Sequence, residues 1–60
     1  METLITNTIR QISHGNSLDG YIEVQQLKDG VWQTTGKFYQ SDDWMMTNLE
    51  KHVQYLKGMG

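Results

Sequence analysis

Apolar residues recur with helical spacing in residues 41–58, which is the clearest periodic pattern in the chain. Positions three and four residues apart lie on one side of a helix, and an apolar stripe there would pack against a core. Ser41 or Asp42 is suited to cap the first turn, and Lys57 suits the last turn. We therefore predict a helix with a buried stripe made of Met45, Met46, Leu49, His52, Val53 and Leu56.

Residues 3–14 carry a weaker pattern that two structures could produce. Their apolar residues, taken with Met1, fall within an arc of about 140° at helical spacing, and Gly15 stands where a helix would end. The segment also contains three threonines and three isoleucines, which favour strands. We predict a helix from the apolar arc and keep a first strand over residues 4–12 as the alternative.

Residues 21–39 alternate between apolar and polar types on both sides of Asp29-Gly30, which predicts a β-hairpin. A two-residue turn would pair Leu27 with Trp32 and leave both faces mixed. A three-residue turn that includes Lys28, with Gly30 as a bulge, would separate the apolar residues from the polar ones. We predict the three-residue turn, which gives a core face of Ile22, Val24, Gln26, Trp32, Thr34, Gly36 and Phe38.

These elements predict a single α+β domain over residues 1–60. It would be a small two-layer domain with an N-terminal helix, an antiparallel β-hairpin and a C-terminal helix. The alternative order is β-β-β-α, with residues 4–12 as the first strand. A chain of 60 residues buries only about 60% of its unfolded surface, and small domains often gain burial by oligomerising. We therefore expect a homodimer.

Composition narrows the compartment and the classes of partner. The net charge is −2 and the five basic residues are scattered, which argues against strong binding to nucleic acid. The chain has no cysteine and hence no disulfide. No apolar run approaches the roughly 20 residues of a membrane span, and no secretory signal is evident. We expect a cytoplasmic protein that does not contact a membrane.

Candidate chemistry is sparse. Ser13 and His14 are neighbours, which does not give them the geometry of a catalytic pair, and we expect His14 near a helix end. Asp42 and Asp43 are explained by helix capping, and His52 by packing on the helix stripe. We therefore predict no enzymatic activity, no cofactor and no metal site.

The second face of the predicted hairpin is the candidate interaction surface. It mixes tyrosines and aliphatic residues with adaptable polar groups, which is typical of protein interfaces. We predict a small non-enzymatic protein-binding or regulatory domain of the size seen in compact bacterial or phage regulators, dimeric through this face. The alternative is a nucleic-acid-binding module. The partner-binding residues would be Tyr21, Gln25, Leu27, Val31, Gln33, Thr35, Lys37 and Tyr39.

Overall fold

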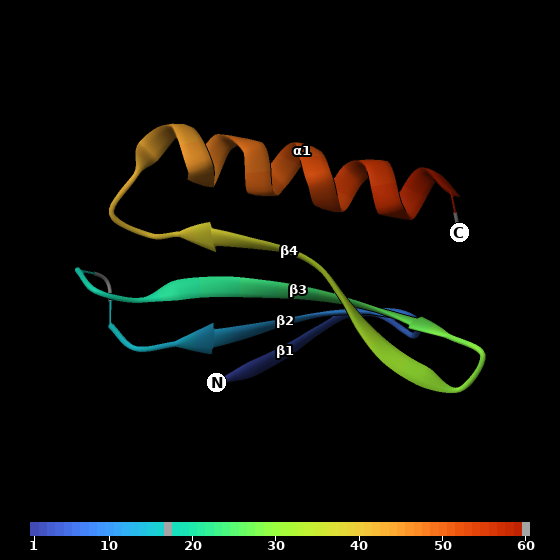
Figure 1. Ribbon diagram of the computed structural model, residues 1–60. Coiled ribbons are helices and arrows are strands. Elements are labelled where there is room, and N and C mark those ends of the chain that lie inside the picture. The colour runs from blue at the N-terminus through green and yellow to red at the C-terminus, as the bar shows by residue number, and fades with distance from the viewer. Residues whose placement is uncertain (17, 60) are drawn as a thin grey trace.

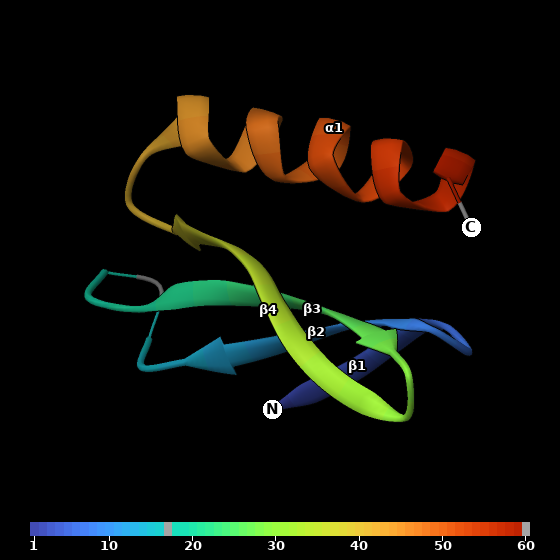
Figure 2. The ribbon, with the colours of Figure 1, turned by 45° about the vertical axis from the view of Figure 1, so that its right-hand side comes forward.

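A computed structural model describes residues 1–16 and 18–59 and contains four strands followed by one helix. The elements are β1 (Glu2–Thr6), β2 (Ile9–His14), β3 (Tyr21–Lys28), β4 (Val31–Tyr39) and α1 (Asp43–Met59). The strands form one antiparallel sheet in the order β1-β2-β3-β4. Figure 1 shows α1 lying across one face of this sheet. The turned view in Figure 2 shows no other described element over the opposite face, which we call the open face.

The predicted N-terminal helix is wrong, because residues 2–14 form the first two strands of the sheet. The alternative of a single strand over residues 4–12 is correct that this segment is extended. It is wrong in the number of strands, because a turn at Asn7 and Thr8 divides the segment into β1 and β2. The Thr6 hydroxyl oxygen accepts the Thr8 backbone N–H at 3.2 Å inside this turn. Such local side-chain bonds favour turns, so the threonines act here against a helix.

The apolar residues of this first hairpin are divided between the two sides of the sheet. Ile5 and Ile9 pack toward α1, whereas Leu4 and Ile12 lie on the open face. A bulge between Leu4 and Thr6 makes Ile5 an extra residue in β1 and breaks the simple alternation. The spacing of these apolar residues along the sequence therefore resembles that of one face of a helix, although they lie on both sides of a sheet.

Asp29 and Gly30 alone form the turn between β3 and β4, so the predicted three-residue turn is wrong. Their φ angles are 54° and 77°, both in the left-handed region that a type I′ turn requires. Leu27 consequently pairs with Trp32 rather than with Val31.

A bulge does occur in this hairpin, but it lies inside β4 at Thr35. Thr34 and Gly36 pair with consecutive residues of β3, which leaves Thr35 as the extra residue. Its hydroxyl donates to the Val24 carbonyl oxygen at 3.2 Å and lies 2.8 Å from His52 Nε2 on α1. The extra residue is thus held to both layers of the domain.

The bulge decides which side chains of β4 face α1. Trp32 and Thr34 lie on the open face before it, and Lys37 and Tyr39 lie there after it. The prediction that Trp32 and Thr34 belong to the core is therefore wrong. Phe38 does pack against the core, as its place on the predicted core face requires.

The predicted C-terminal helix is confirmed as α1. Asp42 caps it, since its Oδ1 accepts the backbone N–H groups of Trp44 at 3.0 Å and Met45 at 3.3 Å. The helix continues through Gly58 rather than ending before it. The predicted stripe is buried or half-buried throughout, at Met45, Met46, Leu49, His52, Val53 and Leu56.

The core lies between the sheet and α1 and is small. Its centre is a cluster of Ile9, Val24, Val53 and Leu56, with Ile5, Phe38 and Leu49 packed around it. Such a core leaves a domain of this size with limited stability, so further burial on another surface would matter.

Residues 15–20 join β2 to β3, and Ser17 among them lies outside the described residues. Asn16 Oδ1 accepts two backbone N–H groups of the loop, each at 2.8 Å. Gly20 is buried against this turn, and its N–H donates to the Asn16 carbonyl oxygen at 2.6 Å. A Cβ atom on Gly20 would lie inside van der Waals contact of the Asn16 and His14 carbonyl oxygens.

We expect Gly20→Ala to destabilise the domain by about 3 kcal/mol or more, because the new methyl group meets backbone that cannot move aside easily. Urea unfolding followed by circular dichroism measures the change. Gly58→Ala is the matched control, since its Cβ would meet nothing within 4 Å. This exposed helical site should be stabilised by up to about 1 kcal/mol. Equal stabilities for the two variants would contradict the proposed packing at Gly20.

Candidate interaction surface on the open face

The open face is defined by the strand register, because residues directly opposite one another in antiparallel strands point to the same side. Its side chains form rows that cross the sheet from β1 to β4. Along the hairpin, charged and polar groups occupy the middle rows and apolar groups occupy both ends, whereas β1 and β2 add Leu4 and Ile12 to the middle rows. The residues of the open face are Glu2, Leu4, Arg10, Ile12, His14, Tyr21, Glu23, Gln25, Leu27, Trp32, Thr34, Lys37 and Tyr39.

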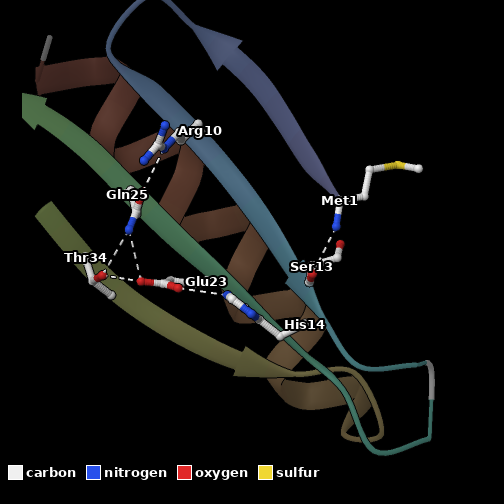
Figure 3. A network of polar contacts seen from close by, with 7 residues as sticks. All are labelled: Met1, Arg10, Ser13, His14, Glu23, Gln25 and Thr34. Atoms are coloured by element: carbon white, nitrogen blue, oxygen red, sulfur yellow. Dashed lines mark hydrogen bonds and ion pairs between the residues drawn. The ribbon is translucent and has the colours of Figure 1, made fainter. Parts of the chain in front are cut away.

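Glu23 is the centre of a polar network on this face (Figure 3). His14 Nε2 lies 2.9 Å from Glu23 Oε1, and Gln25 Nε2 donates to Glu23 Oε2 at 3.1 Å. The Thr34 hydroxyl donates to the same Oε2. Only 14% of the Glu23 side chain is exposed, so these partners replace much of its hydration. The carboxylate is held in place by residues from three adjacent strands.

Arg10 extends the network toward β1. Its Nε donates to Gln25 Oε1 at 2.7 Å, and its Nη1 donates to Glu2 Oε1 at 2.7 Å. The guanidinium carbon lies 4.2 Å from the centre of the Trp32 ring, which is within the range of a cation–π contact. Arg10 therefore connects the polar middle of the face to one of its aromatic ends.

Tyr21 and Tyr39 form what we call the tyrosine cluster, at the end of the hairpin far from the turn. Their ring centres are 5.8 Å apart, and the His14 ring stacks on Tyr21 at 4.7 Å. Lys37 Nζ lies 5.7 Å from the Tyr21 ring centre. More than half of Tyr39 is exposed, so this cluster presents aromatic surface to solvent.

Leu27 and Trp32 form the tryptophan cluster at the other end, next to the turn. They are directly opposite each other in the ladder, and each is half-buried. The Leu27 backbone N–H donates to the Thr8 carbonyl oxygen at 2.8 Å, which ties this end to the first hairpin. The open face thus has two apolar clusters separated by a polar network.

Hydrogen bonding sets the charge state of Glu23. The bonds from Thr34 and His14 lower its pKa below the ordinary value of 4.5, and burial opposes them less strongly. Glu23 therefore remains a carboxylate under mildly acidic conditions.

The structure brings together some of the predicted partner-binding residues and separates others. Five of the predicted residues share the open face, namely Tyr21, Gln25, Leu27, Lys37 and Tyr39. The other three, Val31, Gln33 and Thr35, lie on the side of the sheet that faces α1. Thr35 is occupied by its bonds to β3 and α1.

Sequence reasoning missed several members of this surface. Arg10, Ile12 and His14 were assigned to a helix, which removed β2 from the face. Trp32 and Thr34 were assigned to the core because the bulge was placed in the turn. The two-residue turn suggested by Asp-Gly was the signal that could have placed Trp32 correctly.

The other candidate groups form no reactive pair. Ser13 and His14 point to opposite sides of β2, because they pair with Ile22 and Tyr21 on different faces of the sheet. His52 packs 5.3 Å from the Phe38 ring, which confirms its assignment to a packed helix stripe. In residues 1–16 and 18–59, no group of three His, Asp or Glu side chains is placed to hold a metal ion.

The remaining features add no catalytic geometry. A shallow hollow lies between the β1–β2 turn and the end of α1, lined by Thr6, Asn7, Thr8, Ile9, Leu56 and Lys57. Lys57 is its only titratable lining residue in the described chain. Among the described residues, no helix has the length and apolar character needed to cross a membrane.

Comparison with protein-family models, curated proteins and solved structures finds no match for this chain. Function is therefore inferred from the geometry of the open face.

We expect the stability of the domain to fall as the pH drops from about 4.5, because protonation of Glu23 removes a carboxylate that the folded state favours. Glu23 contributes this stability above its unfolded pKa and loses it as the pH falls through its lowered folded pKa. Glu23→Gln should be destabilised by about 1.5–3 kcal/mol at pH 7, the range for hydrogen bonds to charged groups. It should also lose part of the acid dependence.

Urea unfolding at pH values from 3 to 7 measures both effects. Glu50→Gln is the control, because Glu50 is an exposed helix residue with no side-chain hydrogen bond among the described residues. An acid dependence that Glu23→Gln leaves unchanged would show that the network does not favour the carboxylate.

Proposed function

We propose that this chain is a non-enzymatic protein-binding domain that docks on another protein through its open face. The observation that carries the proposal is an internally hydrogen-bonded polar network flanked by the tyrosine cluster, in which Tyr39 is more than half exposed, and by the half-buried tryptophan cluster. A regulatory role in the cytoplasm and assembly as a homodimer belong to the same proposal. Five of the residues predicted for partner binding remain on this face, and β2 adds Arg10 and His14.

The polar groups of the network already have hydrogen-bond partners within the chain, which supports their burial by another protein. Covering a polar group is costly when its hydrogen bonds to water are not replaced. Here Glu23 already has partners on both oxygens, and Arg10 already donates to Gln25 and Glu2. A second protein could cover these groups without supplying matching donors and acceptors. The network would then fix the shape of the surface, and the apolar clusters would provide the binding energy.

The residue types of the surface support the same function. Tryptophan, tyrosine and arginine are the residues most often found as energetic hot spots in protein interfaces. The open face presents Trp32, two tyrosines and Arg10 within one sheet. Their hydrogen-bonded and stacked arrangement limits their motion, which lowers the entropic cost of binding.

Nucleic-acid binding is the less well-supported alternative. Such a module would use the polar residues of the predicted hairpin face, and of these Gln25 and Lys37 lie on the open face, whereas Gln33 and Thr35 lie on the other side. The charges of the open face nearly balance, since Glu2 and Glu23 oppose Arg10 and Lys37. Aromatic rings on a sheet can stack on bases, but a balanced surface offers little attraction to phosphates.

The experiment for this function uses the immobilised domain to capture proteins from a lysate of its source cells, with quantitative mass spectrometry as the readout. We expect Trp32→Ser and Tyr39→Ser to reduce retention of the captured protein at least tenfold, because each removes an aromatic anchor from the open face. Trp44→Ser and Tyr55→Ser are the matched controls, since these residues are 70% and 65% exposed on α1. The controls should retain the protein as the wild type does.

Other outcomes decide against the proposal. Loss of retention in the α1 variants, with the open-face variants unaffected, would transfer the function to the helix. Salt-sensitive binding to oligonucleotides that is lost with Lys37→Ala would favour the nucleic-acid alternative. Absence of any retained protein, including a second copy of the chain, would reject protein binding.

A further inference from the structure

We propose that the occupant of the open face is a second copy of this chain, placed so that the tryptophan cluster of each copy packs on the tyrosine cluster of the other. This inference rests on the proposed function, because it names the partner of the same surface. Each copy would keep α1 on its outer side, so two sheets would lie between two helices.

The positions of the two clusters make the face complementary to itself. Tyr21 and Leu27 mark the two ends of β3, and their partners Tyr39 and Trp32 mark the same ends of β4. The clusters are separated by six residues of β3, or about 20 Å at the rise of a strand. We place a two-fold axis between the two faces, perpendicular to the strands and over the middle of the hairpin. Rotation about this axis lays β3 and β4 of one copy over the same strands of the other copy, running in the opposite direction. Tyr21 then lies over Leu27 of the other copy, and Tyr39 lies over Trp32.

The polar rows of the hairpin are compatible with this arrangement, because it brings no like charges together. The row of Glu23 and Lys37 in one copy meets the row of Gln25 and Thr34 in the other. No charge of the hairpin therefore lies directly over a like charge, and each meets a neutral polar group. Since Glu23 already has hydrogen-bond partners within its own chain, burial leaves it satisfied.

Two-fold axes parallel to the strands give other arrangements. With the axis over the middle of the sheet, β4 would lie over β1 of the other copy, which contributes only Glu2 and Leu4 to the open face. Tyr39 and Trp32 would then have no strand residue opposite them. With the axis over the middle of the hairpin, β3 would lie over β4 of the other copy, so each cluster would pack on the same cluster of the other copy. The strand lengths disfavour the first of these arrangements, and cross-linking at position 39 distinguishes the second from the proposed one.

The composition of the face favours a second copy over a partner of different chemistry. Balanced charges give no attraction to a strongly acidic or basic molecule. A matching partner must instead present two apolar patches about 20 Å apart on a sheet face, in reverse order. The chain's own hairpin has that pattern. A core of five buried apolar residues also leaves a single copy with much to gain from further burial.

Sedimentation and tryptophan fluorescence test for the dimer. We expect the purified chain to sediment as a dimer that dissociates on dilution, and Trp32→Ser to raise the dissociation constant at least tenfold. Trp44→Phe leaves Trp32 as the single tryptophan, and its emission should shift to longer wavelength on dilution. Trp32→Phe leaves Trp44 on α1, whose emission should not change.

Cross-linking tests the arrangement, because the chain has no cysteine of its own. In the proposed dimer, Tyr39 lies over Trp32 of the other copy, so positions 27 and 39 of opposite copies are diagonal neighbours about 11 Å apart, whereas two copies of position 39 are about 20 Å apart or more. A mixture of Leu27→Cys and Tyr39→Cys should therefore be joined by a short bismaleimide. Tyr39→Cys alone should not be joined.

The outcomes separate this inference from the proposed function. A monomer at all concentrations that still captures another protein through Trp32 and Tyr39 would overturn the second copy and leave protein binding in place. A monomer that captures nothing would reject both. A dimer in which Tyr39→Cys cross-links to itself, or in which Trp44 rather than Trp32 responds to dilution, would overturn the arrangement.

Discussion

The bulge at Thr35 is the constraint that decides which residues of β4 lie on the open face. One extra residue in β4 changes the side of every residue on one half of the strand relative to the other. The Thr35 hydroxyl donates to the Val24 carbonyl oxygen and contacts His52 on α1, so the extra residue is held where the two layers meet. Because of it, Phe38 and Trp32 point to opposite sides of the sheet although both are large and aromatic.

That division gives the two sides of the sheet different roles. The side under α1 collects the aliphatic residues and buries them in a small core. The open face receives Tyr21, Trp32 and Tyr39 of the hairpin, together with charged and polar residues from all four strands. Its polar groups bind one another across three strands rather than pointing singly into water. The polar groups of this face are therefore satisfied within the chain, and apolar residues of the hairpin lie at both ends of it.

The sequence alone was sufficient for the elements that depend on local chemistry. The helix from Asp43 to Met59 followed from its apolar spacing and from Asp42 as its cap, and the structure confirms both. The reversal at Asp29-Gly30 was also visible, because few residue pairs adopt two successive left-handed conformations. These features are decided within a few residues of chain. Five members of the candidate surface were identified for the same reason, as they alternate along two strands.

Only the tertiary structure decided the first hairpin and the register of the second. Residues 2–14 have apolar groups on both sides of a sheet, so no single face could be read from their order, and pairing with β3 makes them strands. The bulge at Thr35 leaves no local signature, because its stabilising partners lie 11 and 17 positions away in sequence. The sequence by itself therefore determined the helix, the place where the hairpin reverses and the presence of its two strands. The fold determined which alternating set was buried, since that choice depends on contacts between residues distant along the chain.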